Sequence, residues 1–356
     1  GEIPDSVLKG LAELGCFAMK IPTQYNGLGL SQVNYNRALH LTGSYCGNLT
    51  ALLSAHQSIG VPQPLLMFGT DEQKEKFLPR FRDGAISAFA LTEANAGSDP
   101  RAMTTTATPT EDGSHYVING EKLWCTNGTK ANVIVVMAVT PPKIVRGKER
   151  KQITAFLVEM NTPGVEVLHR CRFMGLKALY NGVIRFTDVK IPKENMILEE
   201  GDGLRLALKT LNTGRLSIPA GVTGSSKWCM RINRKWTNER VQWGHPIGEH
   251  ETIAGKQAKI ASDTFAMDAV WRVASTMADN KHFDIRLEAA IAKLFNTVAH
   301  YDLLQQTLQI RGGRGFETAD SLRARGEEGI AIERLLRDSR VNLIFEGSSE
   351  IMHLFI

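Results

Sequence analysis

Apolar residues recur at helical spacing near both ends of the chain. In the N-terminal part this period covers 7–17 and again 73–81, and a glycine-punctuated turn at 25–29 lies between the two segments. Toward the C-terminus the pattern predicts three or four long helices, among them 252–279 and 287–309. The alanines and leucines of these segments recur at helix-packing intervals, which indicates a helical bundle.

The central part of the chain has a different texture. Short β-branched runs predict strands at 115–118, 132–140 and 153–158. The dipeptides Asp112-Gly113 and Asn119-Gly120 are typical of turns and bracket the first of these strands. The period of the hydrophobic pattern therefore indicates a β domain between two helical regions.

These changes of pattern predict three domains. We expect helices in residues 1–87, a β domain in 88–202 and a helical domain in 203–356. The charged segment 141–151 is expected to be a loop and is the best candidate for a disordered or variable segment. The fold class predicted by this order is α+β.

Composition and charge make several classes of function less favoured. The 356 residues carry a net charge of +5, and the basic residues are spread along the chain, so neither nucleic-acid nor membrane binding is indicated. Five cysteines without a C-x-x-C pair argue against a disulfide framework and a zinc site, and they favour a reducing compartment. No apolar run approaches the roughly 20 residues of a transmembrane helix. No signal peptide is recognised, although either end could be trimmed.

One carboxylate has an unusual sequence context. Glu346 lies between Phe345 and Gly347 at the end of an apolar run. A carboxyl group in an apolar pocket is held closer to neutrality, which lets it accept a proton near physiological pH. The alternative is a surface Glu that opens a helix.

Several sequence blocks resemble the acyl-CoA dehydrogenase family. The most specific are Phe-Ala-Leu-Thr-Glu-Ala-Asn-Ala-Gly-Ser-Asp at 89–99, Lys-Leu-Trp-Cys-Thr-Asn-Gly at 122–128 and Phe-Glu-Gly-Ser at 345–348. Further blocks follow in the family order at 174–177, 186–192, 240–244 and 309–313. The resemblance implies a helical N-terminal domain, a central β-barrel domain and a C-terminal four-helix bundle.

The resemblance also implies a reaction. Two hydrogens leave the α and β carbons of an acyl-CoA thioester: Glu346 takes the α-proton and FAD accepts the hydride. The backbone N–H of Glu346 polarises the thioester carbonyl, and Gly347 permits close approach. The residues implied to bind FAD are Phe89, Leu91, Thr92, Gly97, Ser98, Trp124, Thr126, Arg240, Gln242, Trp243, Gln309, Gly312, Gly313, Ser348 and Glu350. Those implied to bind substrate are Ser98, Asn212, Arg215 and Gly347, and no metal is expected.

Several of these residues have an ordinary alternative. Trp124 on a strand is more often a core residue, Arg240 could be a solvated helix residue, and a Gly-Ser-Asp turn is common in surface loops. The chain also departs from the family. Ser348 replaces Thr, Ala94-Asn95 replaces Pro-Gly, Arg311 replaces an apolar residue, and 317–336 is longer by about ten residues.

The sequences of segments 55–60 and 212–215 most resemble the long-chain and very-long-chain branch of the acyl-CoA dehydrogenase family. The implied partners are a fatty acyl-CoA, an electron-transfer flavoprotein as electron acceptor and further copies of the chain in a homodimer or homotetramer. The compartment would be the cytoplasm in a bacterium or the mitochondrial matrix in a eukaryote. Three alternatives stay open: an acyl-CoA oxidase that uses oxygen, a non-catalytic or DNA-binding flavoprotein of this fold, and a nicotinamide enzyme, for which the G-x-G-x-x-G motif is missing.

Overall fold

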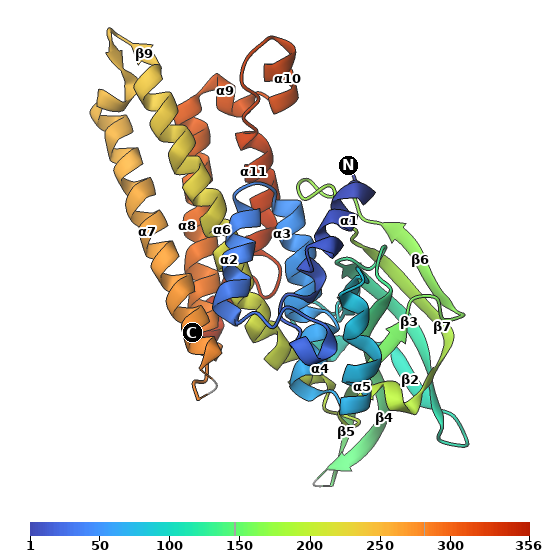
Figure 1. Cartoon of the computed structure of the whole chain (residues 1–356). Helices are drawn as coiled ribbons and strands as arrows, with labels where there is room; N and C mark the ends of the chain where they lie inside the picture. The colour runs from blue at the N-terminus through green and yellow to red at the C-terminus, as the bar shows by residue number, and fades with distance from the viewer. Residues whose placement is uncertain (146, 281) are drawn as a thin grey trace. The chain divides into compact units, whose positions relative to one another are not determined.

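The computed structural model describes residues 1–145, 147–280 and 282–356 and divides the chain into two compact units (Figure 1). Unit 1 comprises Gly1–Ser31, Ala51–Arg172 and Ala178–Gly214, and unit 2 comprises Gln32–Thr50, Phe173–Lys177 and Arg215–Ile356. Helices and strands are both present, as the α+β prediction requires. The predicted central strands lie in unit 1, and the predicted C-terminal helices lie in unit 2.

Unit 1 combines short helices with a sheet. Its helices are α1 (Asp5–Glu13), the second half of α3 (Gly47–Ser54), α4 (Pro62–Phe68) and α5 (Asp71–Phe77). Its strands are β1 (Ser87–Ala90), β2 (Thr106–Pro109), β3 (His115–Cys125), β4 (Val133–Val145), β5 (Lys148–Glu159), β6 (Val165–Arg170), β7 (Gly182–Pro192) and β8 (Met196–Ile197). Within the described residues the strand order is β6-β7-β3-β2-β4-β5-β8, and β1 pairs in parallel with β4.

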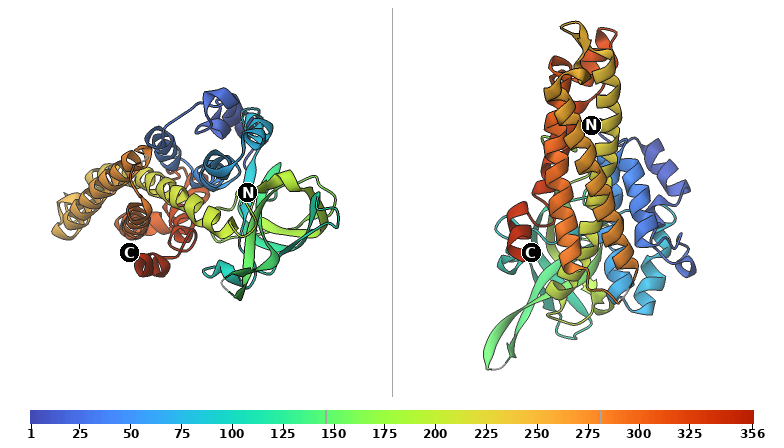
Figure 2. Two further views of the ribbon diagram at one scale, coloured as in Figure 1. Left: turned by 90° about the horizontal axis from the view of Figure 1, so that it is seen from below. Right: turned by 90° about the vertical axis from the view of Figure 1, so that its left-hand side faces the viewer.

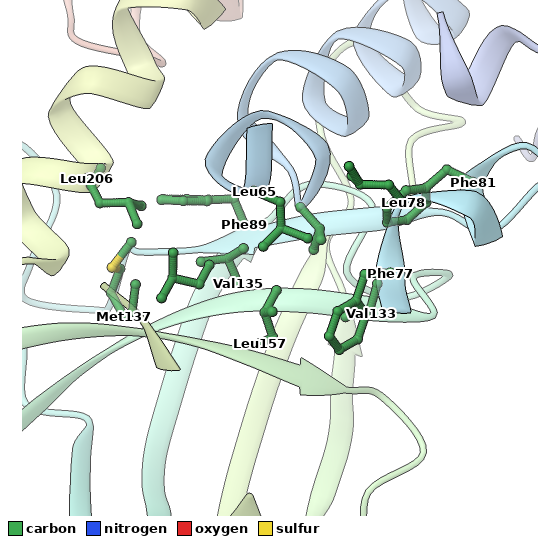
Figure 3. Packing of buried hydrophobic residues seen from close by; sticks show 14 of the residues in the cluster. Leu65, Phe77, Leu78, Phe81, Phe89, Val133, Val135, Met137, Leu157 and Leu206 are labelled. Carbon is green, nitrogen blue, oxygen red and sulfur yellow. The ribbon is translucent and has the colours of Figure 1, made fainter. Parts of the chain in front are cut away.

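Strand β4 forms the centre of the unit 1 core. Successive side chains of a strand point to opposite faces of the sheet. The apolar run of β4 at 133–138 is buried throughout, so both of its faces are covered. Val133, Val135 and Met137 pack in one cluster with residues of the helices, such as Leu65 and Phe77 (Figure 3). The alternate residues Ile134, Val136 and Ala138 pack in a second cluster against the other strands.

Two expectations for this region are wrong. The charged segment 141–151 is not a loop, because β4 and β5 continue through it as a hairpin in which Lys143 pairs with Arg150 and Ile144 with Glu149. The charged side chains of this hairpin can remain in solvent while the backbone groups of its two strands pair with one another. Arg146 lies outside the described residues. Asn119-Gly120 is not a hairpin turn either: it lies inside β3, where the register with β7 shifts and Gly120 has a φ of 147°.

Unit 2 is helical. It contains α2 (Gln32–Gly43), most of α6 (Gly203–Glu239), α7 (Glu251–Asp279), α8 (Arg286–Arg311), α9 (Gly313–Phe316), α10 (Ala319–Ala324), α11 (Ile332–Ser339) and α12 (Ser349–Phe355). A small hairpin of β9 (Val241–Gln242) and β10 (His245–Pro246) joins α6 to α7. Helices α6, α7 and α8 run side by side, and α8 also contacts α11 and α12 (Figure 2). The bounds of α7 and α8 agree with the predicted 252–279 and 287–309 within two residues.

Glycines allow α2 to pack closely against α6. A Cβ atom built on Gly224 of α6 would lie 1.9 Å from the carbonyl oxygen of His40, and one on Gly43 of α2 would lie 2.2 Å from that of Gly221. Any larger residue at these positions would push the two backbones apart. This contact joins an early segment of the chain to the bundle that carries Glu346.

Candidate active site

In unit 1 the structure brings together two segments that the sequence separates by about thirty residues. The backbone N–H of Leu123 donates to the carbonyl of Thr92 over 2.9 Å, and the Sγ of Cys125 lies 3.5 Å from the carbonyl of Phe89. Leu91 and Thr92, which follow β1, are therefore adjacent to the end of β3, which carries Trp124. Gly97 and Ser98 are exposed in the loop after the tight turn between Glu93 and Ala96.

A buried ion pair ties these segments together. The ammonium of Lys122, fully buried, donates to the carboxylate of Glu93 over 2.8 Å and to the carbonyl of Leu91 over 3.2 Å. The same carboxylate accepts from the backbone N–H groups of Thr104 and Thr105. Burial alone would raise the pKa of Glu93, but these hydrogen bonds outweigh it and hold the pKa at about 2. The ion pair was not anticipated from the sequence.

Trp124 is held in a strained and exposed conformation. Its φ is 54°, which is rare for a bulky residue, and 57% of its surface is accessible, whereas Cys125 beside it is 2% exposed. Asn181 donates from Nδ2 to the carbonyl of Trp124 over 3.2 Å and to Oγ1 of Thr126 over 2.9 Å. Because the Thr126 hydroxyl accepts this bond, its own hydrogen can be donated elsewhere. An open indole face beside a poised hydroxyl donor fits a planar, hydrogen-bonding ring system such as a flavin.

In unit 2, Glu346 occupies a tight turn between the 3₁₀ helix η8 (Arg340–Leu343) and α12. Glu346 and Gly347 both have left-handed backbones, with φ values of 54° and 93°. A left-handed conformation costs a non-glycine residue on the order of 1–2 kcal/mol, so the surrounding contacts have to maintain it. Ser348 caps α12, because its Oγ accepts from the N–H of Ile351 over 3.3 Å.

The Glu346 carboxyl is poised between neutral and ionised forms. Its Oε2 is enclosed and has no hydrogen-bond partner among the residues that the structure describes. Burial raises the pKa of Glu346 to about 7, and the positive charges of Arg215 and Lys293 limit this rise. The backbone N–H of Glu346 has no backbone acceptor among the described residues. These properties suit a base that works near neutral pH beside a carbonyl-binding donor.

Two cationic side chains donate hydrogen bonds to backbone carbonyls of this turn. Arg215, from α6 and only 8% exposed, donates from Nε to the carbonyl of Glu346 over 3.2 Å. Lys293, from α8, donates from Nζ to the carbonyl of Gly347 over 2.7 Å. Arg215 was predicted, whereas Lys293 was missed. A single Lys in a helical pattern is usually solvated, and the sequence carries no signal that this one is buried.

Several of the remaining predicted residues of unit 2 lie near Trp236 at one end of the bundle. Trp236 of α6 lies under the guanidinium groups of Arg240, Arg311 and Arg314, with centroid distances of 5.9, 4.8 and 5.4 Å. Its Nε1 donates to the carbonyl of Ile310 near the end of α8. Arg240 therefore lies near the end of α8. Gln309, Gly312 and Gly313, which are in or next to this end, are all exposed.

Gln242 and Trp243 lie in the β9–β10 hairpin, and Trp243 is 88% exposed with a φ of 51°. Glu350 is exposed in the first turn of α12. Asn212 lies in the part of α6 that belongs to unit 1 and is partly buried. The contact of Trp236 with the three arginines was not predicted from the sequence.

The long segment 317–336 is folded onto the bundle end. It contains α10 and the start of α11, and an ion-pair network fixes it. Arg314 pairs with Glu327 at 2.9 Å between Nη2 and Oε1, and Arg325 pairs with both Glu317 and Glu327. Arg311, which departs from the family pattern, is buried here, and its Nε has no partner among the described residues.

Among the residues that the structure describes, no group of His, Cys, Asp or Glu could hold a metal ion, and no helix has the length and apolar character of a membrane span. A cavity of about 650 Å³ lies between α6 and α7, lined in part by Lys227, Arg231 and Arg234, but it contains none of the predicted site residues.

Comparison with protein families gives three matches in order. The N-terminal, middle and C-terminal domain models of acyl-CoA dehydrogenases match residues 1–85, 88–189 and 201–356. Probable acyl-CoA dehydrogenase FadE10 of Mycobacterium tuberculosis is 54% identical over 355 residues, which are 100% of this chain and 54% of that protein. The very long-chain specific acyl-CoA dehydrogenase of Rattus norvegicus mitochondria is 36% identical over 357 residues, 100% of this chain and 53% of that protein. The chain thus spans about half the length of these curated relatives.

Solved structures give the same result. Butyryl-CoA dehydrogenase from Megasphaera elsdenii superposes with a TM-score of 0.90 at 30% identity, covering 99% of this chain and 89% of that one. An acyl-CoA dehydrogenase from Bacillus anthracis, complexed with FAD, superposes with a TM-score of 0.88 at 32% identity, covering 98% of this chain and 61% of that one. Together with the three domain matches, these likenesses show that the chain belongs to the acyl-CoA dehydrogenase family, whose members depend on FAD.

Proposed function

We propose that this chain catalyses the FAD-dependent α,β-dehydrogenation of fatty acyl-CoA thioesters to trans-2-enoyl-CoA. The observation that carries the proposal is the state of Glu346: a pKa raised to about 7, and a carboxyl oxygen that is enclosed and has no hydrogen-bond partner among the described residues. Membership of the family supports the reaction class.

Glu346 acts as the base. Its carboxylate takes the proton from the α carbon, and the electron pair of that C–H bond becomes part of the new double bond as the β hydrogen departs as a hydride. FAD, when bound, supplies the acceptor for that hydride. The N–H of Glu346 donates to the thioester oxygen, which stabilises the charge that develops there. Arg215 keeps the turn in place from the carbonyl side of the same residue.

The residues proposed to bind FAD are those that the family resemblance implies. In unit 1, Phe89, Leu91 and Trp124 supply apolar and aromatic surface, and the hydroxyls of Thr92 and Thr126 supply hydrogen bonds. Gly97 and Ser98 supply an exposed turn for the phosphates. In unit 2 the proposed contributions come from the following residues: Arg240, Gln242, Trp243, Gln309, Gly312, Gly313, Ser348 and Glu350. Asn212, Arg215, Gly347 and Ser98 are proposed to contact the substrate. The uncovered indole of Trp124 is the feature of the described residues that best suits a flavin.

The electron acceptor is proposed to be an electron-transfer flavoprotein, and the active form to be a homo-oligomer. A solved structure described as an electron transferring flavoprotein of Acidaminococcus fermentans contains a chain that superposes with a TM-score of 0.88 at 28% identity. Acyl chains of roughly fourteen carbons or more are proposed to be preferred. This preference is supported by the similarity of the chain to very long-chain specific acyl-CoA dehydrogenases and by the sequences of segments 55–60 and 212–215.

The test is anaerobic mixing of the purified protein with a series of acyl-CoAs from four to eighteen carbons, followed by flavin absorbance. Each buried methylene contributes about 0.8 kcal/mol, so a deep apolar channel can separate long from short chains by orders of magnitude. We expect palmitoyl-CoA, kept below its micelle-forming concentration, to give a higher kcat/KM than butyryl-CoA. The opposite order would refute the long-chain preference, and no bleaching with any acyl-CoA would refute the reaction. A repeat in air that forms hydrogen peroxide at the same rate would identify an oxidase instead.

A further inference from the structure

Lys293 is a fully buried lysine beside the candidate base. It lies on α8 with an exposed fraction of 0%, and its Nζ donates to the carbonyl oxygen of Gly347 over 2.7 Å. That carbonyl belongs to the residue directly after Glu346, so the contact acts on the left-handed turn itself. Arg215 makes the matching contact with the carbonyl of Glu346 from α6. Each of the two residues of the turn therefore accepts a hydrogen bond at its carbonyl, and the two donors come from different helices.

The burial of this ammonium is unfavourable for stability. The ammonium of Lys293 donates its hydrogen bond to the neutral carbonyl of Gly347 rather than to a carboxylate. Buried charges are normally paired, because removal of an ion from water costs several kcal/mol. Burial accordingly lowers the pKa of Lys293 to about 8, although the negative charge of Glu346 opposes this decrease. A neutral or apolar side chain would meet a purely structural requirement at a lower cost in free energy.

We propose that Lys293 is a positioning residue for Glu346: its hydrogen bond holds the turn that aims the carboxyl group, and its charge favours the carboxylate form that accepts a proton. This inference rests on the proposed function of Glu346 as the base. In this arrangement α8 supplies a hydrogen bond to Gly347 and a positive charge beside Glu346, in addition to the hydrogen bond that Arg215 of α6 makes with the carbonyl of Glu346.

The charged groups around the turn are consistent with this role. Arg215 from α6 and Lys293 from α8 both stabilise the Glu346 carboxylate, while Glu350 of α12 acts on Lys293. With Lys293 gone, one of the two cations that counteract desolvation of Glu346 is lost. Ionisation of the carboxyl group then requires a higher pH. The same change leaves the Gly347 carbonyl without its donor and loosens the turn.

Lys293→Met and Lys293→Gln separate the two contributions. Both variants remove the charge, and Gln keeps a shorter donor. The measurement is the rate of anaerobic flavin reduction by a saturating acyl-CoA across pH 5.5 to 9, together with flavin content and melting temperature. Lys259→Met is the matched control, because it removes an exposed lysine from α7 of the same unit, where Lys259 pairs with Asp263.

We expect the acid limb of the rate profile to move upward by on the order of one pH unit in both Lys293 variants. At the high-pH plateau the rate should fall on the order of tenfold or more in Lys293→Met and less in Lys293→Gln, since a mispositioned base loses rate. The control should keep the parental limb and plateau.

Parental limbs and plateaus in both Lys293 variants, alongside an inactive Glu346→Gln, would overturn the inference and leave the proposed function intact. A parental rate in Glu346→Gln would instead remove the proposed function itself. Loss of the cooperative melting transition in both Lys293 variants would assign the residue a structural role and would also overturn the inference.

Discussion

Glu346 combines a strained backbone with an enclosed carboxyl group, and both features are unfavourable for an ordinary residue. The strain is visible in its φ of 54°, and the desolvation in a pKa raised to about 7. The sequence indicated this residue through its apolar neighbours and the following glycine. The sequence could not reveal Lys293 or Trp236, because their significance depends on burial and on contacts between helices that are far apart along the chain. The assigned roles of the other predicted site residues stay predictions.

The first prediction concerns stability and pH. The folded chain keeps a proton on Glu346 between its ordinary pKa of 4.5 and about 7, whereas the unfolded chain releases it. Stability contributed by this group is therefore present below pH 4.5 and is lost as pH rises through about 7. Glu346→Gln should raise the free energy of unfolding at pH 8 by about 1–3 kcal/mol and leave it nearly unchanged at pH 4.5. Chemical denaturation at both pH values measures this difference, and an equal effect at the two pH values would contradict the raised pKa.

The elements with strong periodicity were the most predictable. Helices α7 and α8 have long amphipathic patterns, and their ends fall within two residues of the predicted ones. Local signals failed where tertiary pairing overrides them. The charged segment 141–151 forms a hairpin because its backbone groups pair across β4 and β5, and Asn119-Gly120 forms a bulge because β3 continues past it beside β7. Periodicity also cannot indicate that α2 packs with the C-terminal helices.

The second prediction tests how β1 and β3 are joined. Removal of one partner from a buried ion pair leaves an uncompensated charge and costs about 3–5 kcal/mol. Lys122→Met should therefore destabilise the chain by that amount at pH 7, because the Glu93 carboxylate stays buried. A double variant with Glu93→Gln as well should recover part of the loss. Urea denaturation of Lys122→Met, Glu93→Gln and the double variant gives the coupling energy, and additive effects would show that the two side chains do not interact.

At the scale of the whole molecule, the family follows from several blocks in a fixed order, which no single motif would support. The chain-length preference and the assembly do not follow in the same way, because they depend on pocket depth and on surfaces that a sequence pattern does not describe. Three arginines lie over Trp236 near exposed glycines at one end of the bundle, and Glu327 pairs with one of them, Arg314.

The third prediction concerns cofactor retention and assembly. Arg240→Ala removes one of the guanidinium groups at Trp236 and should weaken FAD retention and loosen the proposed homo-oligomer, because a ligand that binds only the assembled form stabilises it by mass action. Size-exclusion chromatography with absorbance at the flavin band measures both properties. Arg272→Ala, an exposed residue of α7 that stacks on Trp271, is the control. A monomer that retains its full flavin content would contradict this prediction.

The most direct measurement is the rate of anaerobic flavin reduction by palmitoyl-CoA in Glu346→Gln and in the parent protein at pH 8. Both proteins should be purified yellow with equal flavin content, and the parent should bleach on mixing. Since no other described carboxylate combines an enclosed oxygen with a pKa near 7, the variant should be slower by on the order of 10²–10⁴. Reduction of the variant at the parental rate would show that Glu346 is not the base.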